Sequence, residues 1–451
     1  MTSPQLKLKE TATDEYQALL HTVMSSRLMR KELNANWSYV QNRSLEVTDC
    51  QLVRIYPRTN GETVFEFELC LCGQQAVHHQ TIFAEWVGSN VVNRCQETIV
   101  SLRKPRRRQL HREDSDLITC LPNMGLLIRF PGLDERIDGL KLVRKPMLIS
   151  QILRTLKNRN GNARHTRVDV ELLGHRLGKR CIVRVKAEGD TKLSTRSSDN
   201  AFILKLYKMR TERGRDVYDC MKQLSMSGFG LESSIRIPKL MIYLSEWNAI
   251  VMEDVGGVSL PDLSGDRLVD GLARAGQALR KLHNTQIGVE HHHTVDAEID
   301  LLKEKADLVS TLLPEMAGAV EKALKNVVRG LNQCRQYTPA LVHRDFYEKQ
   351  ILIDGDKTIL LDFDTLCMAD PALDVGNFIA HLELNRLQGI LNLENSIAIF
   401  SDAYDGCQSN EFRRRVEIYT RSAALRLTCL YAFWPRWRHA CNPLLEVANA
   451  C

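Results

Sequence analysis

The sequence predicts an α+β protein in which strand-rich segments precede a mostly helical carboxy-terminal part. Residues 46–90 and 167–208 contain runs that alternate apolar and polar side chains, as strands do. Residues 268–282 and 296–336 instead repeat apolar side chains every three or four positions, as amphipathic helices do. Together these patterns predict a helix-containing region with its own sheet, a second sheet, and a helical part.

Length and composition limit the number of domains and the kinds of partner that we expect. The chain has 451 residues, of which 44% are hydrophobic and 26% are charged, so it has room for two or three globular domains. Its net charge of +6 does not call for an extended nucleic-acid surface, although it suits an anionic nucleotide ligand. No run of about 18 apolar residues is present, and the start of the chain is polar, so we expect neither a membrane span nor a secretion signal. The 13 cysteines lack CxxC spacing, which predicts free thiols and a cytoplasmic location.

The first region is predicted to be an α+β domain over residues 1–160. Residues 12–45 read as helix, with Tyr16, Leu19, Leu20 and Val23 on one side. Strands follow at 50–56, 63–72 and 79–87. Their layout weakly resembles the strands from residue 170 onward, so this domain is either a degenerate copy of that sheet or a product of chance patterning.

Two basic stretches follow in this region. Residues 102–108 read LRKPRRR, which could bind nucleic acid or direct the protein to the nucleus, but no aromatic residues interleave with the cations, so a solvated loop is favoured. Residues 154–164 read as a linker, and we place a domain boundary near residue 160.

The next region begins with a predicted hairpin. Val168–Leu173 and Cys181–Val185 are its strands, and Gly174–Gly178 is its turn. A third strand, Ala201–Lys208, carries Lys205 inside an apolar run. Burial of a lysine without a partner is costly, so its position calls for a ligand or an acidic partner. Lys208 is expected to point to the opposite face.

The most informative stretch is residues 341–377. Two apolar runs, Ile351–Ile353 and Thr358–Leu361, flank an Asp-Gly pair, which predicts a hairpin. The hairpin should bring Gln350 and Asp362 together beside the loop that contains Asp345. Carboxylate and amide oxygens gathered in this way are ligands that Mg²⁺ prefers.

Three motifs in this stretch carry a resemblance. They are HRDFYEKQ at 343–350, LDFD at 361–364 and ADPALD at 369–374. In their order and spacing they resemble the protein-kinase-like superfamily, specifically its aminoglycoside/choline phosphotransferase branch, the APH family. One residue departs from the pattern, because Gln350 stands where most members have Asn; it offers the same carbonyl oxygen on one more methylene.

The resemblance implies a two-lobed protein-kinase-like fold, with a small β-rich lobe at 161–256 and a helical lobe at 257–451. It implies that Asp345 accepts or orients the proton of the attacking hydroxyl and that Arg344 steadies the loop. Gln350 and Asp362 would hold Mg²⁺, with Asp364 as a further candidate ligand. Asp374 would cap the loop from the following helix.

The resemblance also implies a nucleotide site. Lys205 would hold the phosphates of ATP, with Lys208 as the fallback. Lys179 could approach a phosphate from the hairpin turn, or the turn could be a plain one. The backbone of Glu253 and Val255 would bond the adenine edge. The acidic partner of Lys205 is left open among three residues of the next helix: Glu212, Asp216 and Asp219.

Two further segments stand apart from these motifs. His291–His293 has no companion ligands and is expected to be an exposed loop rather than a metal site. The aromatic residues of Phe433–Trp437 could line a substrate pocket, but packing among the last helices is favoured.

The predicted function is the transfer of the γ-phosphoryl group of ATP, with Mg²⁺, to a hydroxyl of a small molecule such as a sugar, amino sugar or amino alcohol. No nucleic-acid or membrane partner is expected, and the oligomeric state is open. One alternative is a pseudokinase-like nucleotide-binding or regulatory module that has lost catalysis. A second alternative is an RNA-associated protein that uses residues 102–108.

Overall fold

The computed structural model describes most of the chain: residues 14–57, 62–73, 76–105, 108–111, 114–145, 147–150, 152, 167–188, 201–390, 394–405 and 409–450. The chain forms two compact units. Unit 1 comprises residues 1–211, 244–251 and 433–436, and unit 2 comprises residues 212–243, 252–432 and 437–451. The predicted linker at 154–164 and almost all of the polar segment at 188–200 lie outside the described residues.

The described part of unit 1 begins with three short helices rather than with one long helix. The prediction of a continuous helix over 12–45 is wrong, because the chain forms α2 (Asp14–Met24), α3 (Ser26–Asn36) and α4 (Ser38–Asn42). Ser25 is extended and its side chain accepts a hydrogen bond from the Leu28 N–H, which starts α3. Trp37 is also extended and separates α3 from α4. The predicted buried face of α2 is confirmed, since Tyr16, Leu19, Leu20 and Val23 are all buried.

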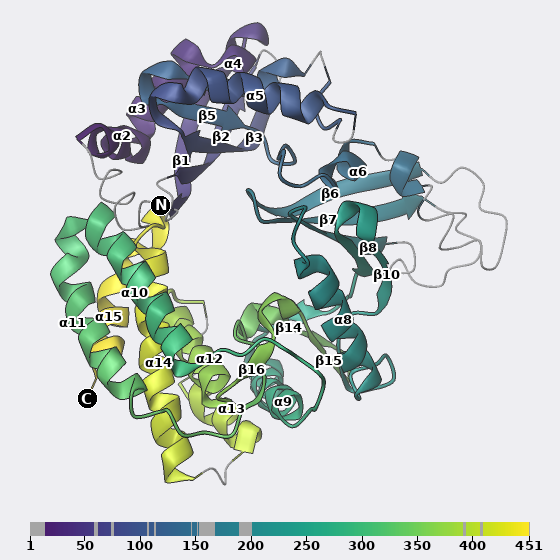
Figure 1. The fold of residues 1–451 in the computed structure, drawn as a ribbon, viewed down its shortest axis with the longest axis vertical. Helices are drawn as coiled ribbons and strands as arrows, with labels where there is room; N and C mark the ends of the chain where they lie inside the picture. The colour runs from purple at the N-terminus through teal and green to yellow at the C-terminus, as the bar shows by residue number, and fades with distance from the viewer. Residues whose placement is uncertain are drawn as a thin grey trace. The chain divides into compact units, whose positions relative to one another are not determined.

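An antiparallel sheet follows these helices (Figure 1). Its strands run in the order β1-β2-β3-β5-β4. They are β1 (Glu46–Pro57), β2 (Thr63–Cys72), β3 (Val77–Trp86), β4 (Ile118–Leu121) and β5 (Leu126–Arg129). Helix α5 (Val91–Arg103) connects β3 to β4 and packs against β4 and β5. The three predicted strands of this region are therefore confirmed.

A second sheet of unit 1 contains neighbours in the order β11-β8-β7-β6. The strands are β6 (Arg167–Arg176), β7 (Arg180–Glu188), β8 (Ala201–Tyr207) and β11 (Ala249–Glu253). The predicted turn at Gly174–Gly178 is wrong, because β6 continues to Arg176 through a bulge after Leu172. The turn is formed by Leu177–Lys179, with Gly178 in the left-handed region at φ 72°.

This sheet is packed against the segment that precedes it. Gly139 immediately precedes helix α6 (Leu140–Arg144) and lies close against this sheet. A Cβ atom at Gly139 would lie only 2.8 Å from the Leu206 side chain and 3.1 Å from the Trp247 carbonyl oxygen. The Met209 N–H donates to the Arg136 carbonyl oxygen at 3.1 Å. Residues 132–145 therefore belong to the same packed unit as β8.

Unit 2 contains two small sheets and most of the helices. One sheet has the order β12-β14-β15-β9, and β13 pairs with β16 in the other. The strands are β9 (Ile235–Arg236), β12 (Val258–Ser259), β13 (Ala340–Val342), β14 (Ile351–Asp354), β15 (Lys357–Leu360) and β16 (Cys367–Ala369); β10 (Leu240–Leu244) precedes β11. The helices are α8 (Arg213–Met226), α9 (Gly265–His283), α10 (Val295–Leu312), α11 (Pro314–Leu331), α12 (Ala372–Leu387), α13 (Ser396–Asp405), α14 (Asn410–Tyr431) and α15 (Cys441–Asn449).

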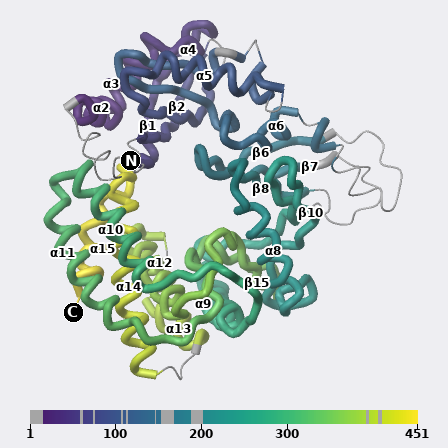
Figure 2. The backbone as a smooth tube through the Cα atoms, viewed as in Figure 1, coloured from purple at the N-terminus to yellow at the C-terminus, as the bar shows by residue number. Residues whose placement is uncertain are grey.

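The helices of unit 2 form a packed group, in which α10, α11, α14 and α15 run side by side (Figure 2). Helices α12 and α14 make a close contact at Gly376, where a Cβ atom would lie 2.6 Å from the Thr420 nitrogen. The predicted helical segments at 268–282 and 296–336 are confirmed, the first as α9 and the second as the two helices α10 and α11.

The aromatic segment after α14 packs in unit 1. The Ile55 N–H of β1 donates to the Phe433 carbonyl oxygen at 2.8 Å, and the Arg54 guanidinium lies 4.5 Å from the centre of the Trp434 ring. Phe433 and Trp434 therefore pack against β1 rather than among the last helices. The cysteines within the described residues are free, and no described helix is long and apolar enough to cross a membrane.

Candidate active site

The predicted hairpin is confirmed in unit 2. Strands β14 and β15 pair with Ile351 opposite Leu360, and Gly355 occupies the turn at φ 57°. Beyond the paired strands, the Leu361 N–H donates to the Gln350 carbonyl oxygen at 2.9 Å. The ladder therefore places Gln350 and Asp362 at the same open end of the hairpin.

The loop that contains Asp345 is bonded to this end of the hairpin. His343 is fully buried, and its Nε2 lies 2.8 Å from the Leu361 carbonyl oxygen. The Thr365 hydroxyl donates to the His343 carbonyl oxygen at 2.8 Å. His343 thus couples the loop to the segment that follows β15.

Asp374, in the first turn of α12, holds the same loop from the other side. Its carboxylate accepts hydrogen bonds from the backbone N–H groups of His343 and Arg344, both at 2.7 Å. It also lies 3.2 Å from Nε2 of His283, whose Nδ1 lies 2.8 Å from the Tyr404 hydroxyl. The prediction that Asp374 caps the loop is confirmed.

Two residues of this site have left-handed backbones. Arg344 has φ 67° and Asp362 has φ 58°. This conformation costs a non-glycine residue roughly 1–2 kcal/mol, so the surrounding hydrogen bonds must compensate for it. Such outliers cluster at functional sites, and here one is next to the predicted catalytic Asp345 and the other is the predicted metal ligand Asp362 itself.

Asp345 faces a pocket of about 220 Å³ within unit 2. Side chains of α10, α12 and α14 complete its lining, among them Lys305, Asn377 and Arg426. Asn377 donates through Nδ2 to the Phe346 carbonyl oxygen at 2.8 Å and thereby fixes the residue after Asp345. The pocket gives a small molecule access to Asp345.

The proposed metal ligands supply hard oxygen donors. Gln350 is buried, and Asp362 and Asp364 follow β15 at the start and in the middle of a short 3-10 helix, Phe363–Thr365. Among the described residues, no group of three His, Cys, Asp or Glu side chains is arranged to hold a metal by itself. One amide and two carboxylates fit Mg²⁺, which usually keeps positions for phosphate and water. The metal roles of these three residues stay predictions.

Lys205 is a buried residue of unit 1. It is 5% exposed, and its ammonium lies 5.7 Å from the centre of the Tyr207 ring, two residues along the same strand face. Lys208 follows the end of β8 and is exposed. The three acidic candidates for pairing with Lys205 are exposed residues at the start of α8 in unit 2: Glu212, Asp216 and Asp219. The choice among them remains open.

The turn before Lys179 binds a carboxylate of its own unit. The Gly178 N–H donates to Asp134, whose carboxylate also accepts a hydrogen bond from Arg136 at 2.9 Å and lies 3.4 Å from His175. Burial would raise the pKa of Asp134, but His175 and Arg136 outweigh it and hold that pKa well below its usual range. The contact supports the plain-turn alternative, and a phosphate role for Lys179 stays a prediction.

Glu253 has its carboxylate engaged within unit 2. It forms a two-pronged salt bridge with Arg236, at 2.8 and 3.1 Å, and accepts the Lys239 N–H at 2.9 Å. Its own N–H donates to the Lys239 carbonyl oxygen at 2.9 Å. An adenine contact at Glu253 would therefore use its carbonyl oxygen, and its partner contact would use Val255.

The prediction for the histidine triplet is wrong at its last residue. His293 is buried, and its Nε2 lies 2.8 Å from a Glu298 oxygen, while the Ser422 hydroxyl donates to the other oxygen at 2.6 Å. Sequence reasoning missed Glu298, which also lines the pocket beside Asp345. Its signal is an acidic residue on the buried face of α10, between Val295 and Leu302.

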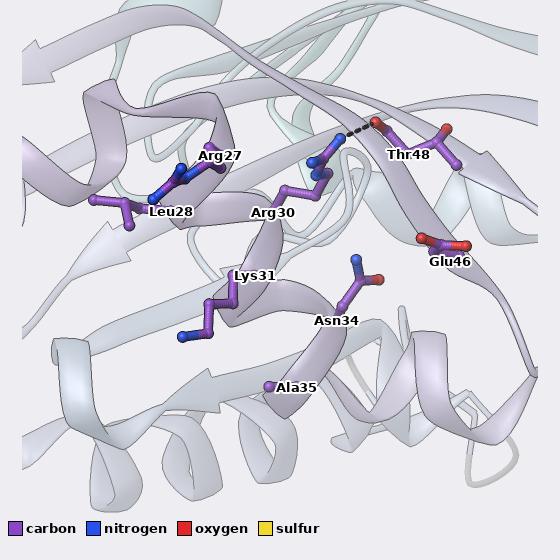
Figure 3. A pocket seen from close by; sticks show the side chains of 8 residues that line it. All are labelled: Arg27, Leu28, Arg30, Lys31, Asn34, Ala35, Glu46 and Thr48. Carbon is purple, nitrogen blue, oxygen red and sulfur yellow. Dashed lines mark hydrogen bonds between the residues drawn. The ribbon is translucent and has the colours of Figure 1, made fainter.

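A second pocket lies in unit 1, between α3 and β1 (Figure 3). Arg27, Arg30 and Lys31 line it, and Arg30 donates to the Thr48 carbonyl oxygen at 2.8 Å. It has a volume of about 680 Å³ and contains none of the predicted site residues. The chemistry predicted from the motifs is therefore not placed there.

Part of the chain is similar to a known family and to solved structures. The sequence model of the family described as "APH: Phosphotransferase enzyme family" matches residues 183–394. A choline/ethanolamine kinase family protein from Mesorhizobium loti is similar in structure, with 19% identity over 66% of this chain and 95% of its own, at a TM-score of 0.46. A choline kinase from Cryptosporidium parvum is 12% identical over 67% of this chain and 94% of its own, at a TM-score of 0.49.

A search of curated proteins found no match. The matched residues contain the loop with Asp345, the hairpin and the strand with Lys205. Residues 183–394 thus match the phosphotransferase enzyme family, and the predicted class of enzyme, a small-molecule phosphotransferase, is confirmed.

Proposed function

We propose that the protein transfers the γ-phosphoryl group of ATP to a hydroxyl group of a small molecule. The observation that supports it most is the arrangement around His343. Hydrogen bonds to Asp374 and to the Leu361 carbonyl oxygen hold the loop with Asp345 beside the hairpin end with Gln350 and Asp362. Phosphoryl transfer depends mainly on positioning and electrostatics, and this network supplies positioning.

Asp345 accepts or orients the proton of the attacking hydroxyl in the pocket that it lines. Arg344, fixed through its backbone by Asp374, steadies the loop. Gln350 and Asp362 hold Mg²⁺, with Asp364 as a further ligand. When bound, the ion neutralises charge on the phosphate oxygens.

The nucleotide is assigned to the residues proposed from the resemblance. Lys205 holds its phosphates, and the Glu253 carbonyl oxygen and the Val255 N–H bond the adenine edge. Lys179 is a weaker candidate for a phosphate contact, since its turn is bonded to Asp134. We also propose a cytoplasmic location.

The test is ADP release by the full chain with Mg-ATP and a panel of alcohols. Asp345→Asn should reduce turnover by about 10²-fold or more, because it removes the proton acceptor, while ATP binding stays within a few fold. Asp356→Asn, the same change in the exposed turn of the hairpin, is the matched control. Undiminished turnover in Asp345→Asn would remove Asp345 from the mechanism.

A second candidate is a pseudokinase-like module that binds the nucleotide without transferring phosphate. Gln350 in place of the usual Asn favours it. This candidate predicts Mg-ATP binding without ADP release for every alcohol tested. Acceptor-dependent ADP release that is lost in Asp345→Asn excludes it.

A further inference from the structure

We propose that the acceptor carries an oxyanion, a carboxylate or a phosphate, in addition to the hydroxyl that is phosphorylated. Arg426 and Lys305 bind this oxyanion in the pocket beside Asp345. The inference rests on the proposed function and narrows its substrate class. The inference favours acidic alcohols as acceptors over the amino sugars and amino alcohols that were among the acceptors expected from the sequence.

The pocket has a size that suits a small metabolite. Its volume of about 220 Å³ lies below the roughly 300–1,000 Å³ of pockets for drug-sized ligands. Its lining belongs entirely to unit 2, so the arrangement of its charges is set within one packed body. An acceptor of a few carbon atoms would contact Asp345 and the cations of the lining at once.

Cations outnumber carboxylates in the lining. Lys305, Arg344 and Arg426 are cationic, whereas the two carboxylates are those of Asp345 and Glu298. In the proposed reaction, Asp345 is occupied with the hydroxyl. Any binding group for an ammonium would therefore have to be Glu298.

Glu298 is already bonded at both oxygens. His293 and Ser422 occupy them at 2.8 and 2.6 Å, and the side chain is almost fully buried. Burial raises the pKa of Glu298, but the hydrogen bonds from His293 and Ser422, together with the nearby charges of His293 and Arg426, outweigh it, so the pKa is below its ordinary value. Glu298 is thus an ionised structural group. An amine in the pocket would face three cations without a carboxylate to pair with.

Arg426 is positioned for an oxyanion. One of its terminal nitrogens donates to Oδ1 of Asn377, whose amide nitrogen bonds the Phe346 carbonyl oxygen next to Asp345. This contact orients the guanidinium and uses one of its five N–H donors. Within the described part of the chain, Arg426 forms no salt bridge with a carboxylate. A guanidinium in this state matches the geometry of a carboxylate or phosphate.

The experiment compares alcohols with matched skeletons and different charge. One set is glycerol, glycerate, glycerol 3-phosphate and 3-aminopropane-1,2-diol; a second is glucose, glucuronate, glucose 6-phosphate and glucosamine. With the full chain and Mg-ATP, kcat/KM for an acidic member should exceed that of its neutral partner by at least about tenfold in one set, and the amine should be poorest. The carboxylate and phosphate arms distinguish the two kinds of oxyanion.

Variants connect this preference to the pocket. Arg426→Gln and Lys305→Gln should each raise KM for the acidic alcohol roughly 10- to 100-fold more than they raise KM for the neutral alcohol. Arg426→Lys keeps the positive charge but loses the planar guanidinium that can donate two parallel hydrogen bonds, so it should retain part of the affinity for the acidic alcohol. Arg413→Gln on α14 and Lys303→Gln on α10 remove exposed cations outside the pocket and serve as controls. Because Arg426 also supports Asn377, Lys305→Gln decides the test if the Arg426 variants do not fold.

The outcomes separate the two proposals. Turnover of neutral alcohols or amines without a preference for acids, or a preference that both variants leave unchanged, overturns the inference while the phosphotransferase function stands. If no alcohol causes ADP release, the proposed function fails. The inference is then tested by measuring the binding of glycerate and glucuronate to the full chain by calorimetry. Binding that weakens in Lys305→Gln but not in Lys303→Gln then supports an oxyanion site, and no binding overturns it.

Discussion

Replacing Asp374 by Asn tests the contact that holds the catalytic loop. The carboxylate and His343 are both fully buried, and the carboxylate accepts three hydrogen bonds, two of them from backbone N–H groups at 2.7 Å. An amide has only one oxygen, so in either orientation its NH₂ group faces the N–H of His343 or of Arg344. Leaving one buried donor unsatisfied costs about 1–3 kcal/mol, and the remaining bonds lose their charge assistance. We expect a loss of roughly 2–4 kcal/mol in the free energy of unfolding.

The assay combines urea unfolding with hydrogen exchange at the amides of His343 and Arg344. Both amides should exchange faster in Asp374→Asn, and turnover should fall by about tenfold or more because the loop places Asp345. Asp402→Asn, at an exposed position of α13, is the matched control. Wild-type stability together with wild-type exchange at both amides would refute the reasoning.

Three further changes test other parts of the molecule. Lys205→Met should abolish phosphoryl transfer and weaken ATP binding measured by calorimetry, whereas Lys208→Met should do little; the reverse result would assign the phosphate contact to Lys208. Gln350→Ala should raise the Mg²⁺ concentration needed for half-maximal ADP release, and Gln350→Asn should keep part of the activity; identical Mg²⁺ curves would remove Gln350 from the metal site. The folded-state pKa of Asp134 lies below its unfolded value, so its stabilising effect is present above about pH 4 and is lost as the pH falls. In Asp134→Asn the urea midpoint should therefore vary less with pH below about 4, and an unchanged pH profile would contradict this.

The catalytic loop and hairpin could be predicted because their contacts are close in sequence. His343 bonds Leu361, 18 residues away, and Asp374, 31 residues away, and both partners fall within motifs of fixed spacing. The hairpin needed only local information, namely two apolar runs around an Asp-Gly turn. Local patterns of this kind are what a single sequence reveals best.

Contacts between distant residues could not be predicted in the same way. The bond between Glu298 and Ser422 joins residues 124 positions apart, and the bond between Asp134 and Gly178 spans 44. No periodicity relates such positions. The sequence therefore did not predict the buried Glu298 on α10 or the hydrogen bond between the Gly178 turn and Asp134. The break between α2 and α3 depends on one capping side chain, Ser25, within an otherwise helical pattern.

The composition of unit 1 has a consequence for the synthesis of the protein. A nascent chain that ends at residue 211 contains the first sheet and strands β6, β7 and β8 of the second, but it lacks β11 and the segment 433–436. Until β11 has left the ribosome, one edge of β8 has no partner, and the Ile55 N–H lacks its acceptor until Phe433 arrives. An open strand edge is a template for pairing with another chain. Unit 1 therefore completes its folding only after residue 436 has been translated, and chains that stop before residue 433 should aggregate more readily than chains that contain segment 433–436.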